Sequence, residues 1–168
     1  EEAGIVSCLK HFPGHGDTRE DTHAGYAASL KTWAQIDSCE MVSFKAGIAA
    51  GVPMIMAAHI AAPNVTGTDV PASLSQTLLS DKLRAELGFE GIIITDALEM
   101  GAIAKHYTSA EAAVLAIKAG ADILLMPADY RQAVDGVVEA VESGQISIGR
   151  IDQSVRRILE LKQIKQLL

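Results

Sequence analysis

The chain has 168 residues, of which 49% are hydrophobic and 21% are charged. This composition excludes a disordered chain, and the length suffices for one domain with its own core but not for two of ordinary size. Fourteen Lys and Arg residues against 21 Asp and Glu give a formal net charge of −7, which argues against a nucleic-acid partner. Cys8 and Cys39 are too few for a disulfide scaffold or a cysteine-based metal site.

Short apolar runs alternate with segments in which apolar residues recur every three or four positions. The runs predict buried strands at residues 5–9, 54–58, 92–95 and 123–126. The periodic segments predict helices marked by these residues: Ile36, Met41, Phe44 and Ile48; Leu79, Leu83 and Leu87; Ala112, Leu115, Ala116 and Ala119; Val134, Val137, Val138 and Val141; Ile151, Val155, Ile158 and Leu159. Thr108 and Glu111 form a predicted capping box at the start of the third helix.

Glycines stand at three of the joints between a predicted helix and the next strand, at Gly51, Gly88 and Gly120. A left-handed helix cap is expected there. The order is four βα units plus a C-terminal helix, so the fold class is α/β with parallel strands and right-handed crossovers. A self-sufficient open sheet of four strands is compatible with this pattern, whereas a closed (β/α)8 barrel needs eight units and ~250 residues.

Residues 46–63 contain no Asp, Glu, Lys or Arg, so His59 is the one side chain in this stretch that can carry a charge. The stretch is mostly Ala and Gly, and Gly51-Val52-Pro53 interrupts it. We therefore interpret it as a helix end, a turn and a buried strand rather than as a membrane span.

Polar side chains follow each predicted strand at once. Lys10 and His11 follow the first, His59 the second, Asp96 the third and Asp129 the fourth. The carboxyl ends of the strands form the ligand face in parallel α/β folds. We therefore expect the functional site at this end of the sheet.

The segment 12–25 has no periodicity and is rich in titratable groups, which is typical of a functional loop. Five side chains in and beside it are of metal-ligand type: His11, His15, Asp17, Asp21 and His23. Pro13-Gly14 disfavours the helix that would place His11 and His15 on one face. A metal-dependent hydrolase and a solvated polar loop are the two alternatives to the hypothesis that follows.

Asp96 and the pair Asp21 and His23 together suggest sugar chemistry. A carboxylate fixed at the end of a buried strand suits attack on an anomeric carbon, with formation of a covalent intermediate. A histidine can protonate the leaving oxygen and later activate water, because its usual pKa is near 6.5. Asp21, two residues from His23, would hold the imidazole in the required tautomer.

These segments resemble glycoside hydrolase family 3, in particular its bacterial β-N-acetylglucosaminidase branch. The resemblance rests on KHFPGHGDT at residues 10–18, DTH at 21–23 and ITDALEM at 94–100. MAAH at 56–59 and PASLS at 71–75 are similar to the connecting motifs of the family. The likeness extends from about residue 4 to residue 162.

The resemblance implies that residues 1–168 are the second, C-terminal half of a (β/α)8 TIM barrel whose N-terminal half lies outside this chain. It also implies that Asp96 is the nucleophile, His23 the acid/base and Asp21 the partner in a His–Asp dyad. The implied sugar-binding residues are Lys10, His11, His15 and His59.

The implied substrate is a terminal β-linked N-acetylglucosamine on peptidoglycan-type fragments, and the reaction needs no metal or organic cofactor. The family resemblance is compatible with the bacterial cytoplasm and with a secreted or cell-wall location. The chain begins Glu1-Glu2 without Met, and we expect it to be a fragment of a longer protein. The missing half-barrel or a second copy of the chain would then be its partner, and these residues alone should have little or no activity.

Three other functions stay open. A β-glucosidase of the same family shares Lys10 and His11, but it usually lacks the loop motif and takes its acid/base from elsewhere. A phosphorylase is compatible with a neutral histidine acid/base, because phosphate would then not face a second carboxylate. A sugar-binding module that has lost catalysis is the third alternative.

Overall fold

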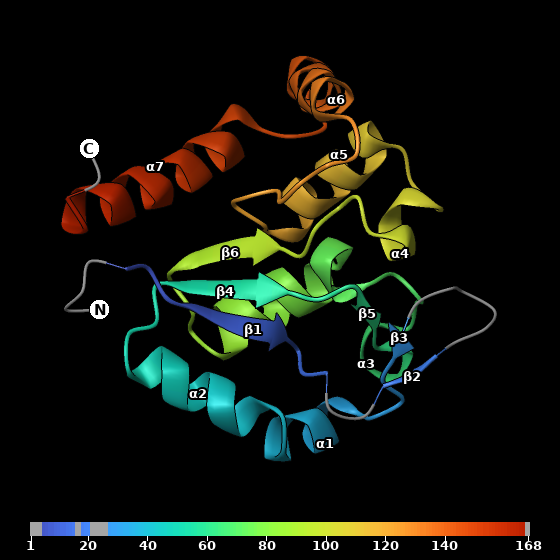
Figure 1. Cartoon of the computed structure of the whole chain (residues 1–168), viewed down its shortest axis with the longest axis vertical. Helices are drawn as coiled ribbons and strands as arrows, with labels where there is room; N and C mark the ends of the chain where they lie inside the picture. Colours follow the sequence, from blue (N-terminus) through green and yellow to red (C-terminus); the bar gives the residue numbers. More distant parts are fainter. Residues whose placement is uncertain (1–4, 16–17, 21–26, 167–168) are drawn as a thin grey trace.

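The computed structural model describes residues 5–15, 18–20 and 27–166. Its main sheet has parallel strands in the order β1-β4-β6, formed by β1 (Cys8–Phe12), β4 (Met54–Ala57) and β6 (Ile92–Thr95) (Figure 1). Ile123 extends this sheet beyond β6 through an isolated parallel bridge to Ile94. The parallel α/β class predicted from the sequence is confirmed.

A second, small sheet has the order β2-β3-β5. It consists of β2 (Arg19–Glu20), β3 (Ala27–Ala28) and β5 (Ile60–Ala61), with β2 antiparallel and β5 parallel to β3. The carboxyl ends of the main strands, drawn as arrowheads, point toward this sheet in Figure 1. The sequence did not predict it, because strands of two residues are too short to show periodicity.

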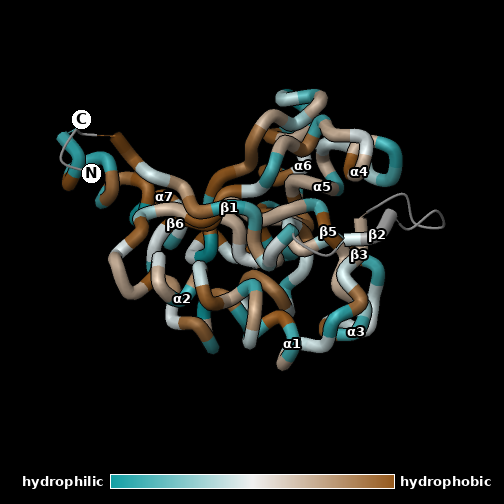
Figure 2. The backbone as a smooth tube through the Cα atoms, turned by 60° about the horizontal axis from the view of Figure 1, so that its bottom comes forward, coloured by the Kyte–Doolittle hydropathy of each residue, from teal (hydrophilic) through white to brown (hydrophobic). Residues whose placement is uncertain are grey.

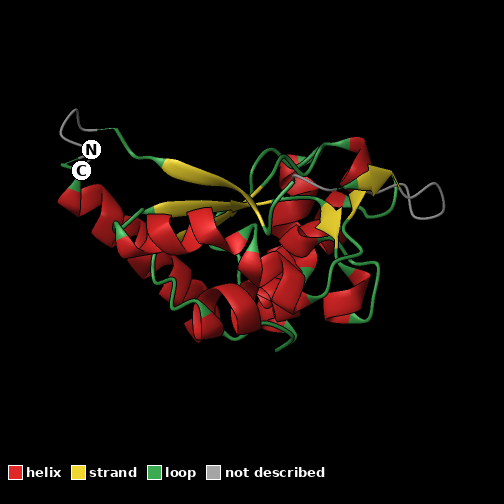
Figure 3. Cartoon of the chain, turned by 90° about the horizontal axis from the view of Figure 1, so that it is seen from below, coloured by secondary structure: helices red, strands yellow, loops and turns green. Residues whose placement is uncertain are grey.

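The helices gather on one side of the main sheet (Figure 3). They are α1 (Trp33–Ser38), α2 (Met41–Ala49), α3 (Pro63–Thr66), the 3-10 turn η1 (Ala72–Leu74), the π-helix η2 (Thr77–Glu86), α4 (Gly101–Ala104), α5 (Ser109–Ala119), α6 (Tyr130–Glu142) and α7 (Ile148–Ile164). The helix expected around residues 36–48 is thus two helices, with a break between Ser38 and Met41.

Two of the four predicted strands are close to the observed ones, and two differ. The strand at 92–95 is confirmed and the one at 54–58 ends a residue earlier. The first strand spans Cys8–Phe12 rather than 5–9, because pairing with β4 outweighs the polar character of Lys10 and His11. The segment 123–126 contributes only the bridge at Ile123 instead of a full strand.

The predicted helix ends are confirmed where specific side chains define them. Thr108 accepts a hydrogen bond from the Glu111 amide, and the Glu111 carboxylate accepts one from the Thr108 amide at 2.8 Å, which completes the capping box. Gly51, Gly88 and Gly120 have φ angles of 76°, 68° and 120°, as the left-handed caps require.

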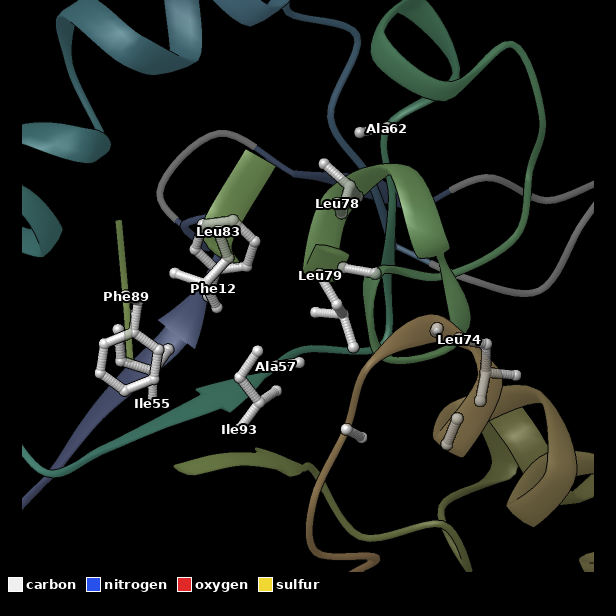
Figure 4. Packing of buried hydrophobic residues seen from close by; sticks show 14 of the residues in the cluster. Phe12, Ile55, Ala57, Ala62, Leu74, Leu78, Leu79, Leu83, Phe89 and Ile93 are labelled. Atoms are coloured by element: carbon white, nitrogen blue, oxygen red, sulfur yellow. The ribbon is translucent and has the colours of Figure 1, made fainter. Parts of the chain in front are cut away.

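The hydrophobic core lies between the main sheet and the helices. Ile55 and Ala57 of β4 have no exposed surface, whereas Met54 and Met56, which alternate with them, are only partly buried. Figure 4 shows Ile55 beside Phe89, with Phe12 and Leu83 packed close by. The helices therefore cover one face of β4 in this chain, while the other face stays partly open.

The hydropathy of the chain follows this arrangement. Many of the hydrophilic stretches lie at the periphery in Figure 2, for example beside α4. Within the described part of the chain, no helix has both the length and the apolar character needed to cross a bilayer.

Asp122 fastens α7 to the amino-terminal end of the main sheet. Its side chain is fully buried, and its Oδ2 accepts hydrogen bonds from the Ile93 amide at 3.0 Å and from the Arg84 guanidinium. Its Oδ1 accepts hydrogen bonds from Ser154 Oγ at 2.6 Å and Arg157 Nη1 at 3.1 Å. Burial lowers the pKa of Arg84 to about 10, which leaves the guanidinium charged at neutral pH. One carboxylate thus joins β6, η2 and α7.

Replacement of Asp122 by Ala should therefore lower the free energy of unfolding by about 3–5 kcal/mol, because the partly buried guanidinium groups lose their counter-charge. The measurement is urea denaturation of the protein followed by circular dichroism. Asp152→Ala, which removes an exposed carboxylate of α7, is the matched control and should change the value by less than about 0.5 kcal/mol. Equal effects of the two substitutions would contradict this role of Asp122.

Candidate active site

Asp96 is held at the carboxyl end of β6 by the main chain. Thr95 before it is fully buried, and the Asp96 amide donates to the Ala57 carbonyl at 2.9 Å. The Ala97 amide donates to Asp96 Oδ1 at 2.9 Å. The side chain is 22% exposed, so a fixed carboxylate is accessible from solvent at the end of the sheet.

His11 lies opposite this carboxylate, at the end of β1. The pairing of β1 with β4 shifts between Lys10 and Phe12, which places His11 at an irregularity of the strand. The peptide bond between Lys10 and His11 is cis. The His11 Nε2 atom lies 3.8 Å from Asp96 Oδ2, and the His11 side chain is 29% exposed.

The environment of His11 favours the neutral imidazole. Burial lowers its pKa from 6.5, and the nearby charges of Lys10 and His15 act in the same direction. The Asp96 carboxylate opposes them, because a negative charge stabilises imidazolium. The pKa remains below its usual value, and near pH 7 His11 can both donate and accept a hydrogen bond.

His15 and Lys10 border the same region. The rings of His11 and His15 lie edge to face with centroids 6.1 Å apart, and His15 Nδ1 is 3.4 Å from Thr18 Oγ1. Both Lys10 and His15 are exposed to solvent. The structure thus brings together Lys10, His11, His15 and Asp96, four of the residues predicted from the sequence.

His59 also lies near Asp96, but in a buried position. It is 6% exposed, with Nδ1 2.8 Å from Ser73 Oγ and Nε2 2.9 Å from the Ala97 carbonyl oxygen. Both ring nitrogens are therefore used within the protein. The sugar-binding role that the family resemblance implies for His59 stays a prediction, and in this structure its two ring nitrogens face Ser73 and Ala97.

The predicted dyad of Asp21 and His23 lies outside the described residues, as does Asp17. Among the residues that are described, no three His, Cys, Asp or Glu side chains lie close enough to hold a metal ion together. The metal-site alternative, which includes Asp17, Asp21 and His23, stays a prediction.

Ser73 and Ala97 are the parts of this site that sequence reasoning missed. Ser73 is a fully buried residue of η1, and Ala97 contributes only main-chain atoms. Neither residue type signals a functional role, and the contact between His59 and Ser73 depends on the tertiary fold.

The Asp96 carboxylate and His11 lie in a chain most of which matches one protein family. Residues 1–161 match the family described as "Glycosyl hydrolase family 3 N terminal domain". The chain belongs to glycoside hydrolase family 3.

Relatives within family 3 include hexosaminidases. The chain is 34% identical over 182 aligned positions to a beta-hexosaminidase A of Pseudoalteromonas piscicida, covering 96% of this chain and 30% of that protein. It superimposes on a family 3 beta-N-acetylglucosaminidase of Paenibacillus with a TM-score of 0.91 and 44% identity, covering 98% of this chain and 32% of that one. A beta-glucoside phosphorylase gives a TM-score of 0.90 at 29% identity, covering 99% of this chain and 32% of its own. The chain spans about a third of the length of these proteins.

The contact between His11 and Asp96 can be tested by titration. Asp96→Asn should lower the pKa of His11 further, because it removes the negative charge that favours imidazolium. NMR of the His11 ring protons between about pH 4 and about pH 8 measures this shift. Asp135→Asn, which neutralises an exposed carboxylate of α6, should leave the titration unchanged. An unchanged or raised pKa in Asp96→Asn would show that the two side chains do not interact.

Proposed function

We propose that this chain supplies the nucleophile and part of the sugar-binding site of a retaining β-N-acetylglucosaminidase. The observation that carries the proposal is the Asp96 carboxylate, which is fixed at the end of β6 and accessible at the ligand face of a family 3 domain. Similarity to a beta-hexosaminidase and to a beta-N-acetylglucosaminidase supports the choice of sugar.

In the proposed reaction, an oxygen of Asp96 attacks the anomeric carbon while the bond to the leaving oxygen breaks. His23 donates its proton to that oxygen, and Asp21 orients the imidazole. A covalent glycosyl-enzyme results. His23 then takes a proton from water, the water oxygen attacks the anomeric carbon, and Asp96 leaves as the free carboxylate.

Asp96 Oδ2 is the oxygen suited to the attack. Oδ1 accepts the hydrogen bond from the Ala97 amide, whereas Oδ2 faces His11 across 3.8 Å. A neutral His11 can also donate to or accept from a sugar hydroxyl, since burial lowers its pKa. Lys10 and His15, both exposed at this edge, would complete the contacts to the sugar from this chain.

The substrate we propose is a terminal β-linked N-acetylglucosamine on peptidoglycan-type fragments, turned over without a metal or organic cofactor. The partly open face of β4 at Met54 and Met56 supports the proposal that a second part of the barrel covers this sheet. Residues 1–168 would form the C-terminal half of a (β/α)8 barrel, and the other half would cover this face.

Substitutions in the complete protein test the two catalytic roles. Asp96→Asn should reduce turnover of an aryl β-N-acetylglucosaminide on the order of 10⁴-fold, as removal of a nucleophile does. His23→Ala should cost about 10²–10⁴-fold with a poor leaving group. It should cost less with an acidic phenol, which leaves without a proton. Asp135→Asn and His106→Ala, at exposed positions, are the matched controls. A largely active Asp96→Asn variant would overturn the proposal and would favour a sugar-binding module.

A phosphorylase is the second candidate, favoured by the similarity to a beta-glucoside phosphorylase. The proposal predicts the same rate with and without inorganic phosphate and N-acetylglucosamine as the product. Acceleration by phosphate, with formation of the sugar 1-phosphate, would identify the protein as a phosphorylase instead.

A further inference from the structure

His59 and Ser73 form a buried polar pair behind the ligand face. They are 6% and 0% exposed, and buried polar groups of this kind are retained only when they find hydrogen-bond partners. His59 lies between β4 and β5, and Ser73 lies in η1, so the pair links the end of the sheet to the segment that precedes η2.

The partners fix where the proton of His59 resides. The Ala97 carbonyl can only accept, and therefore Nε2 carries the hydrogen across the 2.9 Å contact. Burial is the largest influence on the pKa of His59 and lowers it, which favours the neutral ring. Nδ1 is then an acceptor, and the Ser73 hydroxyl donates to it across 2.8 Å. The hydrogen bonds consequently run in one direction, from Ser73 through His59 to Ala97.

Ala97 is held from both sides by this arrangement. Its carbonyl accepts from His59, and its amide donates to Asp96 Oδ1 at 2.9 Å. The flanking main chain is fixed as well, because the Asp96 amide donates to Ala57 at 2.9 Å and the Leu98 amide donates to Leu125 at 2.8 Å. The Ser73 amide in turn donates to the Ala58 carbonyl at 3.0 Å. Rotation of the Ala97 segment would move the amide that holds the Asp96 carboxylate.

We infer that His59, supported by its hydrogen bond with Ser73, is a positioning residue for the nucleophile. His59 fixes the Ala97 segment, so the Ala97 amide binds Asp96 Oδ1 and Asp96 Oδ2 stays free to attack. This inference rests on the proposed function, in which Asp96 is the nucleophile. Its energetic basis is orientation, because a misplacement of about 1 Å at a reacting group can cost about 10²-fold in rate.

Two substitutions of His59 separate its two hydrogen bonds. The amide nitrogen of Gln occupies the place of Nε2, so His59→Gln can keep the bond to Ala97. Asn reaches only the place of Nδ1, so His59→Asn can keep the bond to Ser73 but loses the one to Ala97. In the complete protein, His59→Asn should lower kcat about 10²-fold and His59→Gln less than about 10-fold, with KM changed by less than about threefold in both.

The rate of labelling by a fluorinated N-acetylglucosaminyl fluoride should fall in the same order as kcat, because the nucleophile itself is displaced. Ser73→Ala, which leaves His59 in place, should give a kcat and a labelling rate between those of wild type and His59→Asn. It provides a second test if a His59 variant does not fold. His106→Asn, at an exposed histidine, is the matched control for the amide substitution.

Equal losses of kcat in His59→Gln and His59→Asn would overturn the inference, since a role through Ala97 requires them to differ. A rise in KM at constant kcat would also overturn it and would indicate direct contact with the sugar. An inactive Asp96→Asn variant together with a fully active His59→Asn variant would refute this inference alone. An active Asp96→Asn variant would refute the proposed function itself.

Discussion

The hydrogen bond from the Ala97 amide to Asp96 Oδ1 gives the carboxylate a defined place at the end of β6. Because the donor is a main-chain amide one residue away, no flexible side chain is needed to hold the carboxylate. The buried strand residues Ile93 and Thr95 keep that main chain in position. The proposed roles of Asp96 and His59 depend on this placement. His11 faces the opposite oxygen, and His59 holds the peptide segment that supplies the donor.

The two ends of the main sheet differ in the burial and bonding of their charged side chains. At the amino-terminal end, Asp122 gathers guanidinium groups from η2 and α7 and fastens both helices to β6. At the carboxyl end, Asp96 and His11 are partly exposed, with Asp96 Oδ2 3.8 Å from His11 Nε2. The proposed function would thus place ligand chemistry at the end of the strands opposite the stabilising contacts of Asp122, as in parallel α/β barrels.

The sequence predicted those features that depend on local patterns. The uninterrupted run at 92–95 is typical of a strand buried on both faces, and Thr108 with Glu111 defines a helix start without tertiary information. Features that arise from pairing with distant segments were missed or shifted. The strand at Cys8–Phe12 includes Lys10 and His11, whose polar side chains conceal it, and the small sheet forms only because β5 meets β3.

The candidate site was predictable to a similar extent. Asp96 and His11 could be placed together because the sequence puts both near the carboxyl ends of parallel strands, and in the structure His11 Nε2 lies 3.8 Å from Asp96 Oδ2. The role of His59 could not be read from its position alone, since a histidine after a strand is compatible with a ligand contact and with a buried hydrogen bond. Only the fold reveals that Ser73 and Ala97 use both ring nitrogens.

Covalent trapping tests the central claim most directly. The complete protein would be incubated with a fluorinated N-acetylglucosaminyl fluoride, digested and analysed by mass spectrometry. The account predicts one glycosylated peptide, with the sugar attached to Asp96. Attachment to any other residue, or turnover without a trapped intermediate under conditions that inactivate related retaining enzymes, would contradict it.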